Sequence, residues 1–432
     1  MLHFVEKYIE RQELFAPHDK LIIGVSGGAD SVAMLHVLLT LGYDCEVAHC
    51  NFHLRDAESD RDEKFVEELA QKLNIPFHKT DFDTKTFAKE NSVSIEMAAR
   101  ELRYDWFEEL RKKCNAQYIV VAHSADDVVE TTLMNFTRGT GIDGLRSIEP
   151  KNAAVVRPFL EVWRTKIEQY LQENNLPFVE DSTNAEKIHL RNKFRHSVIP
   201  LLETINPAFK KSTLRTVSHL KDVAKIYHKT VKKEQKKFIF KRKSGFEISI
   251  PELKKRTGYA SLLYEFLKVK DFNSAQVEDI VSGLDGESGQ QYFSKTHRVL
   301  KDRDSLFVCL SGLDPQPPAM QFTIIEKPDS LTTLSDFKDK NTAYLDANKL
   351  QFPLEIRRWQ EGDYFYPFGM RKRKKLSNYF IDKKYSLFEK ENAWLLLSGG
   401  KIVWLVSERT SEHYKIDEKT KDILKIKRIF KD

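Results

Sequence analysis

The sequence predicts an α/β protein whose first 205 residues form a doubly wound parallel sheet, followed by a helical middle domain and a small, mostly β C-terminal domain. Apolar, strand-like runs alternate with amphipathic stretches up to residue 205, which is typical of a parallel sheet with helices on both faces. A Gly-Gly turn joins the first apolar run to a helix, and a Pro-rich segment precedes the last set of strand-like runs. The expected domains are therefore 1–205, 206–314 and 315–432.

In the first domain, each expected strand is a short apolar run and each expected helix is a longer amphipathic one. The strands are expected at 20–25, 45–51, 76–81, 118–123 and 155–159. The helices between them include 59–73, 94–113 and 126–137. Because parallel sheets bind ligands at the carboxyl ends of their strands, the loops after Val25, Ala48 and Ala122 should face one site.

The second and third domains have different patterns. The middle domain begins with a long Lys-rich helix and continues with a strand, two helices and a hairpin, expected at 208–237, 246–250, 259–268, 274–284, 298–302 and 305–310. After a linker at 314–319, short strands predict a mostly β module, at 321–325, 343–345, 354–359, 394–397 and 402–406.

Composition excludes several classes of protein. Charged residues make up 31% and hydrophobic residues 41% of the chain, and no apolar run approaches the ~20 residues of a membrane span. The N-terminus lacks a basic segment followed by an apolar one, so we expect no signal peptide and a cytoplasmic location. None of the four cysteines forms a CxxC pair, which argues against a structural zinc, an iron–sulfur cluster or a redox dithiol. The net charge of +6 modestly favours a polyanionic partner.

The stretch GVSGGADS at 24–31 is the most informative in the chain. Gly27 and Gly28 let the backbone approach a ligand closely, and the helix that follows points its first amides at the loop. With the added hydroxyl donors of its serines, the expected ligand is a phosphate. Asp30 would repel phosphate unless a divalent cation lies between them, which predicts Mg²⁺ at Asp30. The alternative is an ordinary turn with an Asp/Ser cap.

The second strand ends in HCNFHLR at 49–55. Strand alternation puts His49, Asn51 and His53 on one face. Three such residues are compatible with a metal site, but paired histidines on a strand are more often polar site or surface residues. Beside the glycine-rich loop, contact with a nucleotide is the favoured interpretation.

Acidic residues gather after the fourth strand, at the start of a helix. Asp126 and Glu130 are four residues apart, and Asp127 and Glu130 three, so these carboxylates share a helical face. Capping of the helix would account for Asp126 or Asp127 alone. Since His123 ends a strand at the expected site, a catalytic or metal-related role is the favoured interpretation.

Basic residues occur near these segments. The helix at 94–113 places Arg100 and Arg103 on one face with Glu96, and spacing alone favours a solvated, salt-bridged face. Arg138 opens the Gly-rich loop RGTGIDGL, whose GxGxxG follows a helix and is therefore not a dinucleotide-binding motif.

Two further basic segments suit nucleic-acid binding. Arg191 and Arg195 follow the acidic turn EDSTN at 180–184 and are suited to gripping backbone phosphates. In the C-terminal domain, basic side chains that can bind phosphates lie next to aromatic side chains that can stack on unstacked bases. The alternative is a solvated basic loop. This run consists of Arg371, Lys372, Arg373, Lys374 and Lys375.

Together these motifs resemble those of the tRNA(Ile)-lysidine synthetases, which are N-type ATP pyrophosphatases with a Rossmann-like PP-loop domain. The resemblance covers nearly the whole chain, and GDYFYPFGMRKRKKLSNYF at 362–380 distinguishes it from other ATP pyrophosphatases. Thiolating relatives generally carry CxxC pairs, which this chain lacks. The remaining motifs are SGGADS at 26–31, HCNFHLR at 49–55, EMAARELRY at 96–104, AHSADDVVETTLMNFTRGTGIDGL at 122–145, RPFL at 157–160, EDSTN at 180–184 and RNKFR at 191–195.

The resemblance implies a ligase that uses ATP and Mg²⁺ in two steps. The C2 oxygen of the wobble cytidine in tRNA(Ile) with a CAU anticodon is adenylated with release of pyrophosphate, and the ε-amine of free L-lysine then displaces AMP to give lysidine. Another adenylating enzyme of the same fold and a non-catalytic tRNA-binding protein are the rival interpretations. The sequence leaves the oligomeric state open, with a homodimer among the alternatives.

The resemblance also implies roles for individual residues. In catalysis, Asp30 holds Mg²⁺, and Glu130 or Asp127 binds the lysine ammonium or takes its proton. Arg195 and Arg191 stabilise either the developing negative charge or the tRNA backbone. The ATP-binding set is Ser26, Gly27, Gly28, Ala29, Asp30, Ser31, His49 and Asn51. The tRNA-binding set is Arg100, Arg103, Arg138, Arg191, Arg371, Lys372, Arg373, Lys374 and Lys375.

Overall fold

Strand β1 (Lys20–Gly24) is apolar at its centre because both of its faces are covered. Leu21 and Ile23 pack into one hydrophobic cluster and Ile22 into another, and all three side chains are fully buried. This burial on both sides is typical of a central strand in a parallel sheet. The computed structural model describes residues 1–55, 57–180, 190–242, 245–312, 316–326, 339–385 and 387–429. The chain divides into two compact units, Met1–His228 and Lys229–Asp432, each described by itself below.

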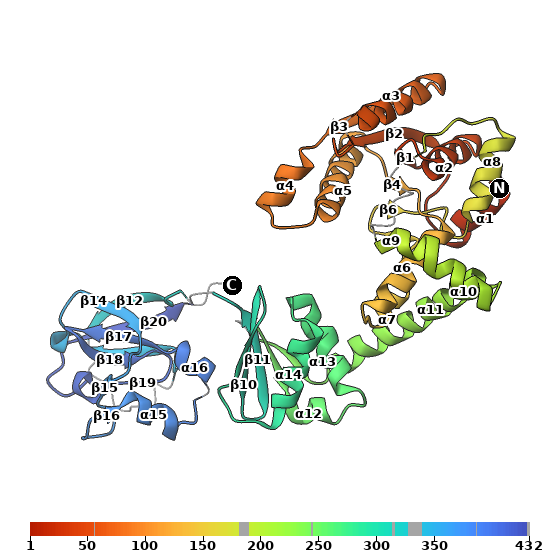
Figure 1. Cartoon of the computed structure of the whole chain (residues 1–432). Helices are drawn as coiled ribbons and strands as arrows, with labels where there is room; N and C mark the ends of the chain where they lie inside the picture. The colour runs from red at the N-terminus through yellow and green to blue at the C-terminus, as the bar shows by residue number, and fades with distance from the viewer. Residues whose placement is uncertain are drawn as a thin grey trace. The chain divides into compact units, whose positions relative to one another are not determined.

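The first unit is built on a six-stranded sheet, as predicted for a doubly wound fold (Figure 1). Every pairing between neighbouring strands is parallel except that of β5 (Lys151–Asn152) with β6 (Val155–Val156). The strand order is β3 (Phe77–Asp81), β2 (Asp44–Asn51), β1, β4 (Tyr118–Val121), β6 (Val155–Val156) and β5 (Lys151–Asn152).

Two predicted strands extend two or three residues too far at their carboxyl ends, to 123 instead of 121 and to 159 instead of 156. The expected strand at 155–159 pairs only at Val155 and Val156, because Pro158 has no amide to donate and the Arg157 amide bonds instead to the carbonyl of Pro150. The expected strand at 118–123 ends at Val121, whose carbonyl accepts a hydrogen bond from the His123 amide in a turn.

Helices cover both faces of this sheet. The larger cluster joins β1 to residues of α1, α2, α3 and α8, and the smaller one joins it to Phe107 and Leu110 of α5. The helix α11 contains the boundary between the two units. The helices are α1 (Leu2–Arg11), α2 (Ala29–Thr40), α3 (Ala57–Lys72), α4 (Thr84–Glu90), α5 (Ile95–Lys113), α6 (Ala125–Thr137), α7 (Ile142–Leu145), α8 (Arg164–Glu173), α9 (Leu190–Lys193), a π-helical turn (Phe194–Val198), α10 (Ile199–Ile205) and α11 (Phe209–Gln235).

The second unit begins with helices and an antiparallel sheet. Its helices are α12 (Ile250–Lys254), α13 (Tyr259–Leu267) and α14 (Ser274–Ser282). The sheet order is β7 (Ile239–Arg242), β8 (Gly245–Ser249), β11 (Ser305–Leu310), β10 (His297–Asp302) and β9 (Gln291–Phe293). The sequence predicted the three central strands, whereas the edge strands β7 and β9 have little buried surface and were missed.

The C-terminal part of this unit is rich in strands, as predicted. One sheet runs β12 (Ala319–Glu326), β20 (Asp422–Ile429), β13 (Thr342–Asp346), and a second runs β14 (Leu354–Arg358), β17 (Trp394–Ser398), β18 (Lys401–Leu405), β19 (Arg409–Thr410). A hairpin of β15 (Tyr364–Phe365) and β16 (Lys374–Lys375) leads into α15 (Leu376–Asp382), and α16 (Leu387–Glu391) follows. Of the expected linker at 314–319, residues 314 and 315 lie outside the described residues and Ala319 already belongs to β12.

Among the residues that the structure describes, no helix combines the length and the apolar character that crossing a membrane requires.

Candidate active site

The loop between β1 and α2 is a tight turn fixed by its glycines. Gly27 has a φ of +90°, a conformation in which residues with a side chain are strained, whereas Gly28 has an ordinary φ of −72°. The carbonyl of Gly27 accepts a hydrogen bond from the Val179 amide at 2.9 Å. Since α2 starts at Ala29, the amides of Ala29 and Asp30 lie next to the loop, where an anion can bind, whereas the amides of Ser31 and Val32 donate to the carbonyl of Gly28 at 3.1 Å.

The two serines of the loop have different positions. The buried Ser31 hydroxyl donates to the carbonyl of Gly28 at 2.9 Å and accepts from the amide of Ser26 at 3.2 Å, so it holds the turn together. The exposed Ser26 hydroxyl accepts from the Gly28 amide at 3.4 Å. Ser26 is therefore the serine better placed to bind a ligand.

Gly27→Ala is expected to lower the free energy of unfolding by about 1–2 kcal/mol, because alanine is strained at a positive φ. Gly28→Ala is the matched control, since its added Cβ would meet only the Ser26 hydroxyl at 3.5 Å. Urea unfolding without nucleotide measures both changes. Equal losses for the two variants would show that the φ of Gly27 is not the cause.

A cavity of about 460 Å³ opens at the carboxyl ends of the central strands. That volume lies within the range of small-molecule sites. The segments after β1, β2 and β4 all contribute to its wall, which confirms that the loops after Val25, Ala48 and Ala122 face one site. The lining includes Ser26, Gly28, Ala29, Asp30, Ser31, His49, Asn51, Phe52, Arg55, Asp62, Arg103, Tyr104, His123, Arg164 and Arg195.

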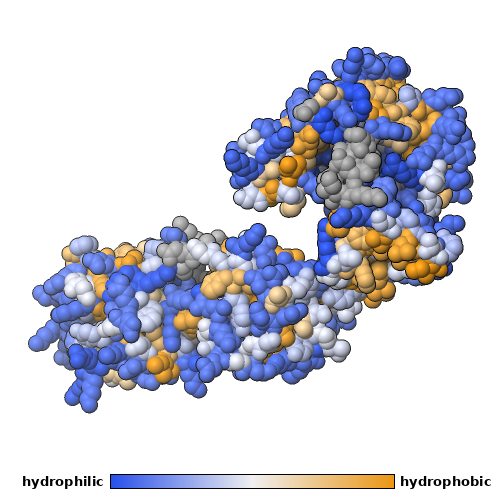
Figure 2. All heavy atoms as spheres, in the orientation of Figure 1, coloured by the Kyte–Doolittle hydropathy of each residue, from blue (hydrophilic) through white to orange (hydrophobic). Residues whose placement is uncertain are grey.

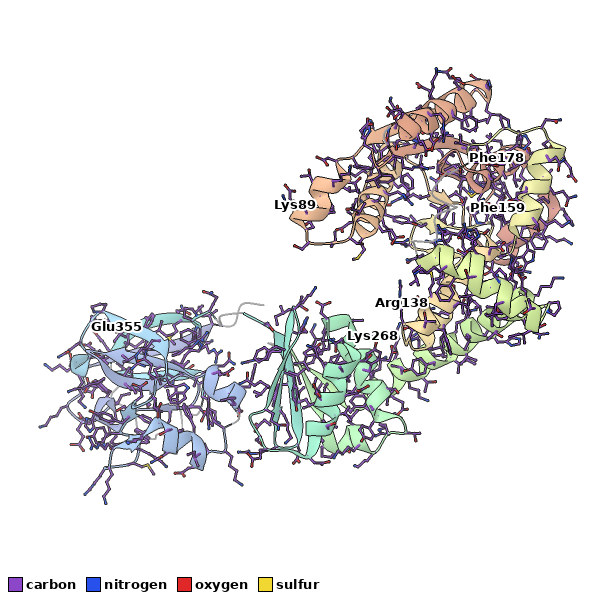
Figure 3. The ribbon with its side chains drawn as sticks, in the orientation of Figure 1. Lys89, Arg138, Phe159, Phe178, Lys268 and Glu355 are labelled. Atoms are coloured by element: carbon purple, nitrogen blue, oxygen red, sulfur yellow. The ribbon has the colours of Figure 1, made fainter. Side chains whose placement is uncertain are left out.

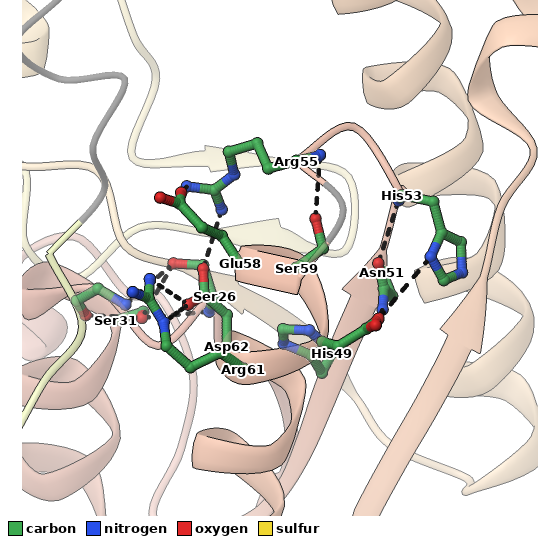
Figure 4. A network of polar contacts seen from close by, with 12 residues as sticks. Ser26, Ser31, His49, Asn51, His53, Arg55, Glu58, Ser59, Arg61 and Asp62 are labelled. Carbon is green, nitrogen blue, oxygen red and sulfur yellow. Dashed lines mark hydrogen bonds and ion pairs between the residues drawn. The ribbon is translucent and has the colours of Figure 1, made fainter.

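His49 and Asn51 line the cavity at the end of β2 and are nearly fully buried (Figure 4). His49 Nδ1 lies 2.9 Å from the carbonyl of Val25, and burial lowers the pKa of His49. A carbonyl only accepts, so Nδ1 carries the proton and Nε2 is left as an acceptor. Asn51 donates to Glu63 at 3.0 Å, while the exposed His53 contacts Asp81 at 2.9 Å. Asn51 and His53 both contact Asp60, whereas His49 bonds to Val25, so the three side chains do not converge on one metal ion.

Asp30 stands in the first turn of α2 and lines the cavity. Its Oδ1 is buried and has no hydrogen-bond partner among the described residues. The pKa of this carboxyl is raised to about 6, chiefly by burial and also by Asp127, while Arg164 and Arg195 act in the opposite direction. An unpartnered carboxylate oxygen at the glycine-rich loop is a suitable ligand for Mg²⁺.

The acidic residues of α6 are held by specific partners. Asp127 Oδ2 accepts hydrogen bonds from the Ser124 amide at 2.8 Å and from its hydroxyl at 3.1 Å, so Asp127 does cap the helix. Asp126 accepts from the Arg164 amide at 2.9 Å and pairs with Lys210 at 3.1 Å. Capping and helix docking thus explain much of this acidic cluster.

Glu130 is buried to 1% exposure and is held by two arginines. Its two oxygens accept from Arg195 at 2.6 and 3.1 Å, and Arg191 lies 3.2 Å from Oε2. Burial raises the pKa of Glu130, and the ion pair with Arg195 opposes this effect. Glu130 therefore fixes the guanidinium of Arg195, which lines the cavity.

His123 also lines the cavity, and its Nδ1 is buried without a hydrogen-bond partner among the described residues. Burial lowers its pKa to about 4, against the effect of Asp127. The imidazole is therefore neutral at pH 7 and is suited to hydrogen bonding rather than to charge pairing.

The basic residues predicted on α5 stack on aromatic rings. The Arg103 guanidinium lies 5.1 Å from the centre of the Phe52 ring, which stacks on Phe82 at 5.6 Å. Arg100 lies 5.0 Å from the ring of Tyr104. Of these two arginines only Arg103 lines the cavity, and Arg138 lies exposed at the end of α6 (Figure 3).

The predicted basic run lies in the hairpin of β15 and β16 in the second unit. Its first three residues belong to the loop, and Lys374 and Lys375 form β16. Arg371, Lys372 and Arg373 are exposed, and Lys374 pairs with Asp382. The Arg373 guanidinium lies 5.3 Å from the centre of the half-exposed Tyr364 ring. A hollow of about 470 Å³ lies beside these residues, and this end of the unit, labelled β15 and β16 in Figure 1, is hydrophilic in Figure 2.

The sequence did not identify every residue of the cavity wall. Arg164 reaches the site from α8, where no motif marks it. Arg55 donates to the buried Asp62 at 2.9 Å, and Arg61 donates to the same carboxylate at 2.8 Å (Figure 4). Arg55 and Asp62 are seven residues apart and lie on either side of the start of a helix, so their spacing could have predicted this ion pair. No such spacing indicates a role for Arg164.

The parallel sheet, the glycine-rich loop and the cavity at its carboxyl edge define a PP-loop protein. The family model for the PP-loop domain matches residues 2–202, that for the TilS substrate binding domain matches 241–310, and that for the TilS C-terminal domain matches 354–427. The chain belongs to the tRNA(Ile)-lysidine synthase family and is an ATP-using ligase of the PP-loop type.

Individual relatives match along nearly their whole length. The tRNA(Ile)-lysidine synthase of Bacteroides thetaiotaomicron is 47% identical over 97% of this chain and 98% of its own. That of Parabacteroides distasonis is 46% identical over 98% of this chain and 99% of its own. Among solved structures, the U34-tRNA thiolase NcsA from Methanococcus maripaludis aligns with 50% of this chain and 77% of its own, at 16% identity and a TM-score of 0.42.

Proposed function

We propose that this protein ligates L-lysine to C2 of the wobble cytidine in tRNA(Ile) with a CAU anticodon, through an adenylated tRNA and at the expense of ATP. The observation that supports it most directly is the unpartnered Oδ1 of Asp30 beside the glycine-rich loop, in a cavity that Arg164 and Arg195 also line. A carboxylate and two cations around a phosphate loop suit cleavage between the α- and β-phosphates of ATP.

In the first step, the chain binds and orients ATP. The amides of Ala29 and Asp30 at the start of α2 and the Ser26 hydroxyl bind the phosphates. His49 Nε2 and Asn51 contact the nucleoside. Asp30 holds Mg²⁺, which when bound shields the charge of the phosphates. Arg164 and Arg195 stabilise negative charge as the C2 oxygen attacks the α-phosphorus and pyrophosphate leaves.

In the second step, a carboxylate accepts a proton from lysine, because an ammonium is not a nucleophile. The ε-amine then forms a bond to C2, and AMP leaves. Arginines occupy both oxygens of Glu130, whereas Asp127 Oδ1 lies 4.0 Å from Arg195. We therefore assign the lysine amine to Asp127 and the positioning of Arg195 to Glu130.

The proposal is tested by incubating the protein with ATP, Mg²⁺, radiolabelled lysine and unmodified tRNA(Ile) with a CAU anticodon. We expect pyrophosphate release and incorporation of lysine, with no incorporation into elongator methionine tRNA of the same anticodon. Release of pyrophosphate without lysine incorporation would identify another adenylating enzyme of this fold. Binding of tRNA without any release would identify a binding protein.

Arg371→Ala combined with Arg373→Ala is expected to weaken tRNA binding and to reduce its salt dependence. Each phosphate that the hairpin no longer neutralises should lower the slope of log K against log salt concentration by about 0.7–0.9. Filter binding at several salt concentrations measures this slope. Lys401→Ala, at an exposed lysine on β18, is the control and should leave the slope unchanged. An unchanged slope in the double variant would exclude the hairpin from the tRNA interface.

A further inference from the structure

A second cluster of potential ligands lies in the first unit, outside the cavity. Glu46 of β2, His78 of β3 and Cys114 at the end of α5 bring a carboxylate oxygen, an imidazole nitrogen and a sulfur within 4.8 Å of one another. None of the three lines the cavity. Glu46 and His78 lie near the amino ends of their strands, whereas the cavity is at the carboxyl ends.

The contacts in this cluster converge on one atom of the imidazole ring. His78 Nε2 lies 2.8 Å from Glu46 Oε2 and 3.8 Å from Cys114 Sγ. A nucleophilic Cys-His-carboxylate triad uses the two ring nitrogens for its two partners, one on each side. Here both contacts fall on Nε2, so the cluster is not such a triad, and one ligand atom from each of the three side chains lies close enough to the others to share a metal ion. The other oxygen of Glu46, Oε1, pairs with Lys20 at 2.5 Å. The oxygen that would bind a metal ion, Oε2, is therefore not the one that pairs with Lys20.

The donor types and distances favour zinc. Zinc binds sulfur at about 2.3 Å and nitrogen or oxygen at about 2.0–2.2 Å, so tetrahedral ligands are roughly 3.3 Å (N···O) and 3.6 Å (S···N) apart. The observed separations of 2.8 and 3.8 Å need shifts of only about half an ångström. Magnesium and calcium prefer oxygen-only sites. Since His78 and Cys114 are half-buried, water can reach the fourth position.

We propose that Glu46, His78 and Cys114 form a zinc site that joins β2, β3 and the end of α5. The absence of CxxC pairs argued against zinc, but that pattern detects only ligands close together in sequence. Burial and the carboxylate of Glu46 raise the pKa of the Cys114 thiol, so zinc displaces a proton when it binds. The site is independent of the proposed reaction, and its test needs no tRNA or lysine.

The test titrates Co²⁺ into the full-length protein after treatment with a chelator. We expect one equivalent of Co²⁺ to produce a thiolate-to-cobalt absorption band, which Zn²⁺ then abolishes. Cys114→Ser should remove the band, and His78→Ala should weaken Co²⁺ binding at least ~10-fold. Cys309→Ser is the matched control, because Cys309 is another half-buried free thiol, and it should retain the band.

Two outcomes of the Co²⁺ titration would overturn the proposal. One is Co²⁺ binding without a thiolate band, and the other is an unchanged band in Cys114→Ser. Zn²⁺ should also raise the unfolding temperature of the wild type but not of Cys114→Ser, provided that circular dichroism shows both to be folded. Equal effects of Zn²⁺ on the two proteins would show that the cluster is only a hydrogen-bonded network around Glu46.

Discussion

Arg195→Ala is expected to lower the free energy of unfolding by about 3 kcal/mol at pH 7.5 and to reduce pyrophosphate release at least ~100-fold. Glu130 is buried to 1% exposure, and Arg195 binds both of its oxygens. Removing one partner of such a pair leaves a buried charge without full compensation, which costs about 3–5 kcal/mol. Arg191, at 3.2 Å from Glu130, offsets part of that cost. Urea unfolding and a pyrophosphate assay measure the two effects separately.

A second variant separates the structural role of Arg195 from its role in the reaction. In the double variant Arg195→Ala, Glu130→Gln, no buried carboxylate is left unpaired, so stability should recover by about 1–2 kcal/mol. Pyrophosphate release should not recover, because the guanidinium that lines the cavity is still absent. Recovery of both would show that Arg195 acts only through stability. Arg191→Ala, at a half-exposed arginine, should cost about 1 kcal/mol or less.

Features that depend on neighbours in sequence were predicted well. Most strands of the first sheet were located within one or two residues, because burial on both faces gives continuous apolar runs such as Leu21-Ile22-Ile23. The glycine-rich loop was predicted because its residues are contiguous and their conformations are set locally by Gly27. The edge strand β7 was missed because its residues are largely exposed, so it lacks an apolar pattern.

Features that join distant segments were not predictable from spacing. Glu130 and Arg195 are 65 residues apart, and each was identified as a candidate without any sign that they form a pair. The amide of Arg164 donates a hydrogen bond to the carboxylate of Asp126, which is 38 residues away in sequence. Only the tertiary fold brings these two groups together. The cluster of Glu46, His78 and Cys114 likewise assembles from three elements. In each case tertiary packing decides which polar side chains meet.

Asp30→Asn is expected to stabilise the protein without ligands and to abolish its activity. The pKa of Asp30 rises from 3.8 to about 6 on folding, chiefly through burial, so the folded state binds the proton more tightly than the unfolded state. Ionised Asp30 therefore destabilises the fold increasingly from pH ~4 to pH ~6 and by a constant amount above that. Asparagine removes this penalty, and the free energy of unfolding should rise by about 1–3 kcal/mol at pH 7.5 and by nothing near pH 4.

The same variant should lose pyrophosphate release and the stabilisation that we expect Mg²⁺ with ATP to give the wild type, because the carboxylate oxygen proposed to bind Mg²⁺ is replaced by an amide. In the wild type, Mg²⁺ binding should weaken as the pH falls through about 6, when Asp30 takes up its proton. Asp126→Asn is the control of opposite sign, since it breaks the ion pair with Lys210 and should destabilise the fold. Thermal unfolding between pH 4 and 8, with and without Mg²⁺ and ATP, measures the wild type and both variants. If Asp30→Asn were destabilising at pH 7.5, Asp30 would be a residue that stabilises the fold, and not a carboxylate whose ionised form is unfavourable until a cation binds.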